Sequence, residues 1–335
     1  MKKLVTILLT IILLSTAVLA FGCNNQPEKG KVNIKYYADG GGIVNAILGG
    51  KETIGLVPEP AATALIKQAS AQEKTIYRLD LQELYNSTEK AYPQAVLMVK
   101  KSVIGAHSEL VENLKNKVTE STSWIKSNTS DAVKAINDNG GSQLKAPALN
   151  EQAIDACKIY WQGAQEAKSS VQNYINGIIE IDSKKASAVN DDFFYSSVET
   201  ANPKDEYRFI MPDGAPALAM AKVIYDNDEL GTDKNISYSV VASSQIQANL
   251  ADGGADFIVA PVNLASKLYK AKSTSDHYVM VAVLTHGNFY IMSTEKITVK
   301  DLADKQVAVP MMGAVPDWTF KMVLEKHDLS YQTVE

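Results

Sequence analysis

Leu48 to Lys67 reads LGGKETIGLVPEPAATALIK, and Ala251 to Lys270 reads ADGGADFIVAPVNLASKLYK. Each stretch predicts a glycine turn, a short apolar strand, a proline-containing loop and a helix with apolar residues at helical spacing. Aligned without gaps, the two share Gly50/Gly253, Pro58/Pro261, Ala62/Ala265, Leu65/Leu268 and Lys67/Lys270. The chain therefore uses one strand–loop–helix module twice.

A second pair of stretches supports the duplication. Phe209 to Ile224 (FIMPDGAPALAMAKVI) and Val307 to Leu324 (VAVPMMGAVPDWTFKMVL) both predict a strand, a proline, a loop with Gly-Ala, a second proline and a helix. Two modules, each used twice, predict two similar α/β lobes. Ligands of open α/β sheets bind beyond the carboxyl ends of the strands, so we expect a binding cleft between the lobes.

Composition sets the class of protein. The 335 residues are 46% hydrophobic and 21% charged, which is ordinary for a globular protein and sufficient for two domains. The net charge of −5 argues against nucleic-acid binding. Arg78 and Arg208 are the two arginines among the cations, and both fall within predicted strands.

The amino terminus predicts export. Lys2 and Lys3 precede an apolar run from Leu4 to about Phe21, which Gly22 and Cys23 follow. These residues and the polar tether to Lys31 resemble a bacterial lipoprotein signal, with Cys23 as the lipid-modified residue. An uncleaved signal anchor is the alternative, and either places the folded part outside the cytoplasmic membrane. Cys157 is then alone, which predicts a buried, inert thiol.

The remaining pattern alternates strands and helices. Strands are predicted at VNIKYYA (32–38), TIGLVP, TIYRLDL, AVLMVKK (95–101), YRFIM, YSVVA and VMVAVLTHGNFYIMS. Residues 108 to about 174 instead repeat apolar residues at helical spacing and predict an amphipathic helical region. Ser196 to Glu206 is polar and predicts a connector.

Four stretches resemble the amino-terminal half of ABC-transporter substrate-binding lipoproteins of the thiamine-precursor/nitrate/sulfonate type: MPDGAPALAMAKVI, GGADFIVAPVNLASKLY, THGNFYIMS and LADKQVAVP. DGGGIVNAILGGKETIGLVPEPAATALIK and AYPQAVLMVKK resemble the carboxyl-terminal half. The resemblance covers most of the mature chain. It implies an α/β fold of two lobes, the type II periplasmic-binding-protein-like fold, with mixed sheets, flanking helices and an interlobe cleft.

The order of the halves departs from that family and indicates a circular permutation, in which SYQTVE at the chain end would continue into VNIKYYADGG. A natural, an engineered and an artefactual origin remain open. The expected organisation is a signal peptide (1–22), a tether (23–31), lobe two (32–94), a hinge strand with the helical region returning to lobe one (95–195), a connector (196–206), lobe one (207–294) and the rest of lobe two (295–335).

Catalytic constellations are absent from the sequence. His107, His277, His286 and His327 lack metal-ligand spacing, and each is interpreted as a surface or satisfied histidine. Two SxxK matches, at Ser87–Lys90 and Ser293–Lys296, lack the companion motifs of β-lactamases. A pyrimidine-synthase enzyme has a similar fold, but the cysteine cluster on which it depends is missing here.

Loops that follow strands supply the candidate ligand-binding residues. In lobe one these are Pro212, Asp213, Gly214, Ser243, Ser244, Pro261 and Asn263, and in lobe two Met312, Gly313, Asp317, Trp318, Asp39, Gly40, Glu59 and Tyr92. Each loop precedes a helix whose first amides lack intrahelical partners. Plain helix capping is the alternative for Asp213, Asp39 and Asp317. Glu59, between two prolines, is expected to face the cleft.

These residues predict a binding protein rather than an enzyme. Carboxylates, amides and the rings of Tyr92, Trp318, Phe289 and Tyr290 favour an uncharged or amine-bearing heteroaromatic, such as a thiamine-type pyrimidine. Nitrate or a sulfonate is the alternative, since backbone amides alone can hold an anion. We expect a monomer without cofactor or metal that is anchored to the membrane by Cys23 and serves an ABC permease and ATPase. A sensory module is a further alternative.

Overall fold

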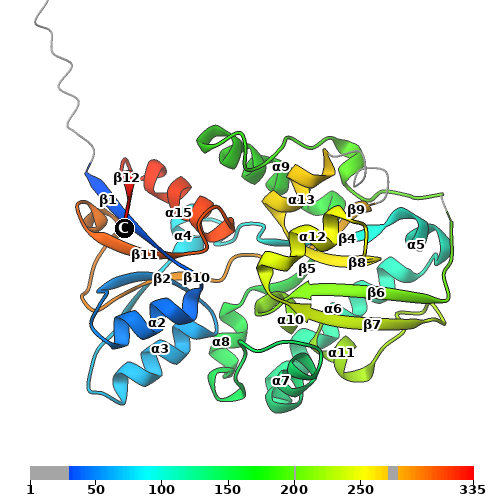
Figure 1. Ribbon diagram of the computed structural model, residues 1–335, viewed down its shortest axis with the longest axis horizontal. Coiled ribbons are helices and arrows are strands. Elements are labelled where there is room, and N and C mark those ends of the chain that lie inside the picture. The colour runs from blue at the N-terminus through cyan, green and yellow to red at the C-terminus, as the bar shows by residue number, and fades with distance from the viewer. Residues whose placement is uncertain (1–29, 200, 271–277) are drawn as a thin grey trace, which may run out of the picture. The chain divides into compact units, whose positions relative to one another are not determined.

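Two six-stranded sheets with helices on their faces organise the chain (Figure 1). The computed structural model describes residues 30–199, 201–270 and 278–335. We call the residues around one sheet lobe two (31–85 and 289–335) and those around the other lobe one (95–285). The predicted α/β class, with two lobes and mixed sheets, is confirmed.

The sheet of lobe two has the order β12-β1-β11-β2-β10-β3. Its strands are β12 (Ser330–Val334), β1 (Lys31–Tyr37), β11 (Gln306–Pro310), β2 (Ile54–Pro58), β10 (Phe289–Ser293) and β3 (Tyr77–Asp80). The four strands from β12 to β2 are parallel, whereas β10 runs antiparallel to both β2 and β3. Because β2 is buried on both sides, its sequence IGLVP is apolar throughout.

The sheet of lobe one has the order β5-β9-β4-β8-β6-β7. Its strands are β5 (Ile159–Gly163), β9 (Tyr278–Thr285), β4 (Ala95–Lys100), β8 (Phe257–Pro261), β6 (Glu206–Pro212) and β7 (Asn235–Val241). Here β4 runs antiparallel to β8 on one side and to β9 on the other, and the edge strand β5 runs antiparallel to β9. All eight residues of β9 are buried, as its unbroken apolar pattern predicts.

Helices cover both faces of the lobe-two sheet. They are α2 (Gly40–Leu48), α3 (Ala61–Ser70), α4 (Leu81–Tyr85), the 3-10 helix η4 (Val299–Leu302) and α15 (Val315–Lys326). Figure 1 shows α2 and α3 on one face and α15 with α4 on the other. Each layer has its own apolar core: Ile43 and Leu65 belong to the first, Phe320 and Leu324 to the second.

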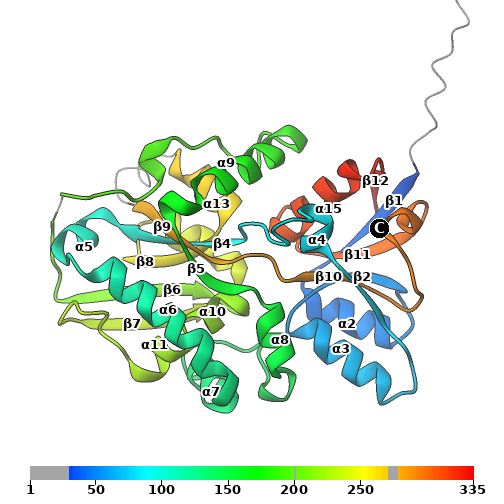
Figure 2. The ribbon, with the colours of Figure 1, turned by 180° about the vertical axis from the view of Figure 1, so that it is seen from behind.

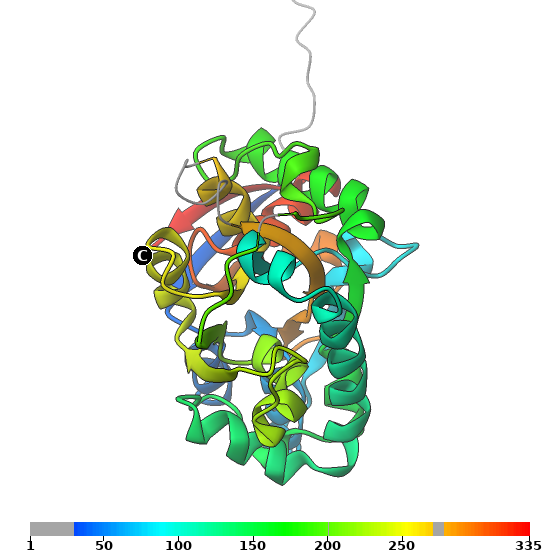
Figure 3. The same ribbon diagram turned by 90° about the vertical axis from the view of Figure 1, so that its right-hand side faces the viewer.

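Helices also cover the sheet of lobe one (Figure 3). One core contains residues of α5 (Lys101–Ala106), α6 (Leu110–Ser127), α7 (Thr129–Asp138), α8 (Glu151–Ala156), α10 (Ala215–Ala219) and α11 (Ala221–Asp226). The other contains residues of α9 (Ala164–Ile181), α12 (Ile246–Ala251) and α13 (Val262–Tyr269). Short 3-10 helices η1 (Ala146–Ala148), η2 (Asp191–Phe193) and η3 (Ser243–Gln245) complete this lobe. The predicted helical region is thus confirmed, interrupted by the short strand β5.

Two segments cross between the sheets, residues 86–94 and residues 286–288, seen in cyan and orange in Figure 2. They run side by side, because Tyr92 N donates to His286 O (3.2 Å) and Gln94 N donates to Thr285 O (2.9 Å). The lobe-one boundary expected at residue 294 is too late, because β10 pairs with β2 and β3 of lobe two.

Strand β1, at the beginning of the described chain, pairs with strands from the end of the chain. It lies between β12 and β11, parallel to both, with Lys31 opposite Ser330 and Asn33 opposite Gln306. Ignoring β12, the order β1-β11-β2-β10-β3 matches β7-β6-β8-β4-β9 of the other sheet, position by position. The two lobes are therefore built on the same plan.

Candidate functional site

A cavity of about 700 Å³ lies between the lobes. Lobe two contributes Arg78, Asp80 and Tyr290, whereas lobe one contributes Asn150, Glu151, Gln152, Asp155, Ala156 and Lys158. Tyr290 also bridges the lobes, since its hydroxyl donates to the carbonyl of Ala156 (3.3 Å). The cavity is thus placed where a ligand would contact both lobes at once.

Arg78 is the central cation of the lobe-two wall. Its Nη1 lies 2.8 Å from Glu59 Oε1, and its guanidinium carbon lies 4.2 Å from the centre of the Tyr290 ring. Strands β3 and β10 are antiparallel neighbours, which brings Arg78 beside Tyr290 although more than two hundred residues separate them. The Arg78 side chain is 27% exposed, whereas that of Glu59 is fully buried.

Glu59 supports this wall from behind. Its carboxylate accepts from the backbone nitrogen (3.0 Å) and the hydroxyl (2.9 Å) of Thr63, in the first turn of α3. Burial raises the pKa of Glu59, and the hydrogen bonds from Thr63 and the charge of Arg78 oppose that rise. The carboxylate is thus engaged within lobe two and reaches the cavity only through Arg78.

The lobe-one wall comes from α8 and the residues after it. Asn150 caps α8, because its Oδ1 accepts from Ala153 N (2.8 Å). Asp155 is paired with Lys126 at 2.6 Å, and Glu151 with the same lysine at 3.6 Å. The carboxylates of Glu151 and Asp155 share this wall with Lys158, and Arg78 lies in the lobe-two wall, so the lining carries both signs of charge.

His286 lies directly behind Lys158, whose carbonyl accepts from His286 N (3.1 Å). Its imidazole stacks on the ring of Tyr160, with centroids 3.5 Å apart and planes 7° apart. Burial lowers the pKa of His286 to about 3, and the Lys158 backbone opposes this only in part. Neither ring nitrogen makes a hydrogen bond in the described structure. The interpretation of His286 as a surface or satisfied histidine is therefore wrong.

The predicted residues after β6 and β7 serve the fold of lobe one. Asp213 Oδ2 accepts from the backbone nitrogens of Ser142 (2.6 Å) and Gln143 (2.9 Å), and its Oδ1 accepts from Gly214 N (2.8 Å). Asp213 therefore fixes the loop after α7. Pro212 ends β6 and Gly214 precedes α10, with a φ of 104° that favours glycine. Ser243 and Ser244 open η3.

The predicted residues after β8 include an unpartnered group. Pro261 ends β8, and Asn263 stands in the first turn of α13. Asn263 Nδ2 donates to the carbonyl of Lys185 over a long 3.4 Å, whereas the buried Oδ1 has no partner in the described structure.

In lobe two, the loop before α15 is held by its own side chains. Asp317 is fully buried and accepts from Tyr36 Oη (3.0 Å), Gly313 N (2.8 Å) and Lys321 Nζ (3.0 Å). Trp318 Nε1 donates to the carbonyl of Gly313 (2.9 Å), and its ring packs in the apolar core of lobe one. Met312 is 68% exposed.

The remaining predicted residues have structural contacts as well. Asp39 caps α2 by accepting from Gly42 N (2.8 Å), which is the capping alternative. Gly40 lies so close to Pro58 that a β-carbon there would be 2.5 Å from its ring. Tyr92 is buried and stacks on Tyr174 of α9 (5.6 Å between centroids, 6° between planes).

The cavity lining, as far as the structure describes the chain, contains none of the fifteen predicted ligand-binding residues. Glu59 comes nearest through Arg78, and Tyr290 was expected as a stacking ring. Sequence reasoning set Arg78 aside because it lies within a strand. The signal that could have identified it is the alternation of TIYRLDL, which places Arg78 and Asp80 on one side of the strand and Tyr77, Leu79 and Leu81 on the other.

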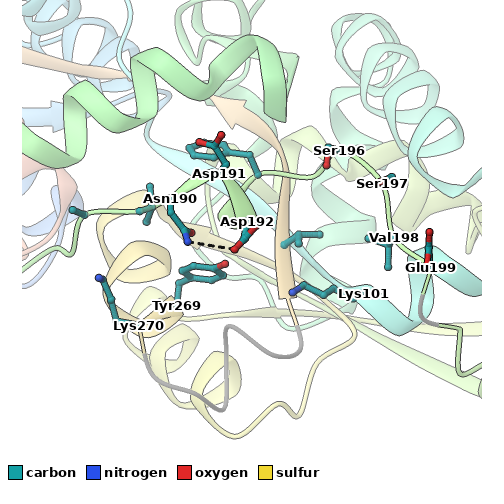
Figure 4. A pocket seen from close by; sticks show the side chains of 14 residues that line it. Lys101, Asn190, Asp191, Asp192, Ser196, Ser197, Val198, Glu199, Tyr269 and Lys270 are labelled. Carbon is teal, nitrogen blue, oxygen red and sulfur yellow. Dashed lines mark hydrogen bonds between the residues drawn. The ribbon is translucent and has the colours of Figure 1, made fainter.

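A second cavity, of about 990 Å³, lies in lobe one beside α5 and η2 (Figure 4). Its labelled side chains include Asp191, Asp192 and Glu199, with Lys101 and Lys270 on other parts of the wall. Asp191 is paired with Lys168 at 2.7 Å. This cavity contacts neither lobe two nor the crossing segments, so the fold does not favour it as the ligand site.

The described residues also bear on metal binding and on membrane attachment. No group of three or more potential metal ligands occurs among them. Likewise, no helix among these residues has the length and apolar character needed to span a membrane. Cys157 is buried with a free thiol, and burial raises its pKa. The Cys23 prediction lies outside the described residues.

No protein-family model matches the chain, and no curated protein matches it. Several solved structures are similar to it. NikA from Brucella suis in complex with Fe(III)-EDTA has a TM-score of 0.34 at 10% identity, over 78% of this chain and 57% of that one. NikA from Staphylococcus aureus in complex with Ni(L-His)2 has a TM-score of 0.30 at 10% identity, over 81% of this chain and 59% of that one.

A third similar structure is the PBP AgaA from A. tumefaciens R10 in complex with agropinic acid. Its TM-score is 0.25 at 12% identity, over 77% of this chain and 54% of that one. The chain thus spans little more than half the length of the solved proteins that it matches.

Proposed function

We propose that this protein is an extracytoplasmic solute-binding protein that captures a small molecule between its two lobes and delivers it to an ABC importer. The cavity between the lobes carries this proposal. It is bounded by Arg78 and Tyr290 on one side and by Lys158 on the other, beside the paired crossing segments. Such a site can open and close by bending at two short segments while each sheet stays rigid.

The proposed ligand is an uncharged or amine-bearing heteroaromatic, of which a thiamine-type pyrimidine is the leading example. The aromatic ring of Tyr290 in the cavity lining supports an aromatic ligand. Arg78 in the lining supports the second candidate, a sulfonate or nitrate. Its pairing with Glu59 weighs against that candidate, because part of the guanidinium is already engaged.

The proposed setting is the outer face of the cytoplasmic membrane, with a lipid on Cys23, a monomeric protein and a permease with its ATPase as partners. The chain order is proposed to be a circular permutation. In support, β1 lies in register between β12 and β11, and the described residues on both sides of position 200 are mostly exposed, as a connector requires. The proposed domain boundaries are those of the sequence, with the crossing to lobe two moved to residues 286–288.

A ligand screen tests the function. We expect one pyrimidine, among pyrimidines, sulfonates, nitrate and flavins, to raise the melting temperature of the mature domain without being consumed, because a ligand that binds only the folded state stabilises it. Stabilisation by nitrate or a sulfonate alone would favour the second candidate. Chemical conversion of the ligand would instead support an enzyme, and the absence of any binding would overturn the proposal.

A further inference from the structure

The two crossing segments and the adjoining end of β9 contain a group of buried polar atoms without hydrogen-bond partners in the described structure. They are Tyr92 Oη, Gln94 Oε1, Thr285 Oγ1, both ring nitrogens of His286 and Asn288 Oδ1. These residues lie close together, because Tyr92 N donates to His286 O and Gln94 N donates to Thr285 O, and Asn288 follows two positions after His286. Buried polar groups in folded proteins are normally paired, so this concentration at one place points to a missing partner.

The unpaired atoms are mainly acceptors. Asn288 Nδ2 donates to the carbonyl of Glu59 (3.1 Å), which fixes the orientation of the amide and leaves Oδ1 as the free atom. His286 is neutral because burial depresses its pKa, so one ring nitrogen carries a hydrogen and the other is an acceptor. The hydroxyls of Thr285 and Tyr92 can act in either sense. A partner that satisfies this set must supply hydrogen-bond donors.

The same residues border the cavity from behind. His286 is linked through its backbone to Lys158, and Asn288 through Glu59 to Arg78, and both Lys158 and Arg78 line the cavity. Tyr160 covers one face of the His286 ring while remaining 44% exposed itself. A molecule that entered from the cavity as the lobes separate would therefore meet these acceptors at the hinge.

We propose that Thr285, His286 and Asn288 form the inner end of the ligand site and select a neutral, flat ligand that bears N–H donors, such as an amino-substituted heteroaromatic. This inference rests on the proposed solute-binding function. It assigns recognition to the crossing segments rather than to the loops at the helix starts, and it explains why polar atoms are left without partners where the lobes meet.

Two substitutions test the proposal in the full-length mature domain. Thr285→Val and His286→Phe keep the shape and, for His286, the stacked ring, but remove the unpaired polar atoms. In the ligand-free protein we expect both to leave the melting temperature unchanged or to raise it, since they remove buried atoms without partners. Thr232→Val is the matched control: Thr232 is equally buried, but its hydroxyl donates to the carbonyl of Glu229 (2.8 Å), so its loss should lower the melting temperature.

Binding is measured by calorimetry with 4-aminopyrimidine, which bears an N–H donor, and 4-methoxypyrimidine, which does not. We expect the amino compound to bind at least tenfold more tightly, and each hinge variant to weaken it at least tenfold while Thr232→Val does not. Hinge variants that lower the melting temperature and retain binding would mean that water satisfies these atoms, and the inference would be overturned. Equal or tighter binding of the methoxy compound would overturn it as well.

A failure of the proposed solute-binding function can be distinguished from a failure of the inference about the hinge. If no compound of the wider screen binds, the proposed function fails and the ligand role of the hinge fails with it. If a compound binds the wild type and both hinge variants equally well, solute binding stands and only the inference about the hinge is overturned.

Discussion

The two copies of the repeated module share a backbone plan but treat their polar residues differently. In lobe two the module is β2 and α3, and in lobe one it is β8 and α13. Both begin at a glycine with positive φ, 72° at Gly50 and 67° at Gly253, a conformation that glycine adopts without strain. Both strands have the same burial pattern and end at a proline.

After that proline the copies diverge. In the first copy, both carboxylate oxygens of Glu59 accept hydrogen bonds within lobe two, from Thr63 and Arg78. Asn263 in the second copy has one long hydrogen bond and a free, buried Oδ1. Glu59 aligns with Val262, and Asn263 aligns with Pro60, so the two polar side chains stand one position apart near the helix start. The duplicated scaffold therefore repeats the backbone, whereas the local partners decide whether a polar side chain beside the proline is hydrogen-bonded within its lobe.

Breaking the Glu59 contacts should have the largest effect. In Arg78→Met the buried carboxylate loses its charged partner, and such a loss costs about 3–5 kcal/mol when both partners are buried. Because Arg78 is partly exposed, we expect the free energy of unfolding to fall by about 2–3 kcal/mol, measured by urea denaturation.

Arg208→Met is the matched control for this experiment. Arg208 is the other arginine of the chain, and its side chain is exposed on β6. We expect its replacement to change the free energy of unfolding by less than about 0.5 kcal/mol. Equal losses in both variants would show that the Arg78–Glu59 pair has no special role.

The protonation of Glu59 gives a smaller, pH-dependent effect. Burial raises its pKa in the folded protein, so the folded state holds a proton to higher pH than the unfolded state does. The stability from this proton is complete below the unfolded value, about 4.3, and is lost as the pH rises through the folded pKa. We expect Glu59→Gln to remove this loss.

The measurement is the difference in unfolding free energy between wild type and Glu59→Gln, followed upward from pH 4. The wild type should lose stability relative to the variant as the pH rises. A difference that stays constant, or that changes in favour of the wild type, would contradict a raised pKa.

The sequence predicted the two lobes because they depend on apolar periodicity and on repeated glycines and prolines, which are local signals. The positions of β2, α3, β8 and α13 follow directly from them. The site depends instead on pairing between distant segments. Arg78 meets Tyr290 only because β3 and β10 are neighbours, and His286 meets Tyr160 only because the strands on both sides of it are folded.

The carboxylates at helix starts also show that contacts between distant segments cannot be read from local sequence. Asp213 stands at a strand end, as a ligand-binding residue would, but three backbone nitrogens already occupy its oxygens. Two of those nitrogens belong to Ser142 and Gln143, some seventy residues earlier in the chain. No local pattern in the sequence distinguishes an engaged carboxylate from a free one.

Asn263 should show the smallest effect on stability, and this completes the comparison of the two modules. Asn263→Leu removes one 3.4 Å hydrogen bond together with a buried oxygen that has no partner, and these two losses act in opposite directions. We expect the ligand-free unfolding free energy to stay within about 0.5 kcal/mol of the wild type. Ser266→Ala, one turn further along α13, is the control: its hydroxyl donates to the carbonyl of Asn263 (2.8 Å) and accepts from Ser187 N (3.3 Å), so its loss should cost about 1 kcal/mol. A loss for Asn263→Leu as large as that for Arg78→Met would mean that both copies of the module use their polar residue for the fold, and that the asymmetry between the lobes is only apparent.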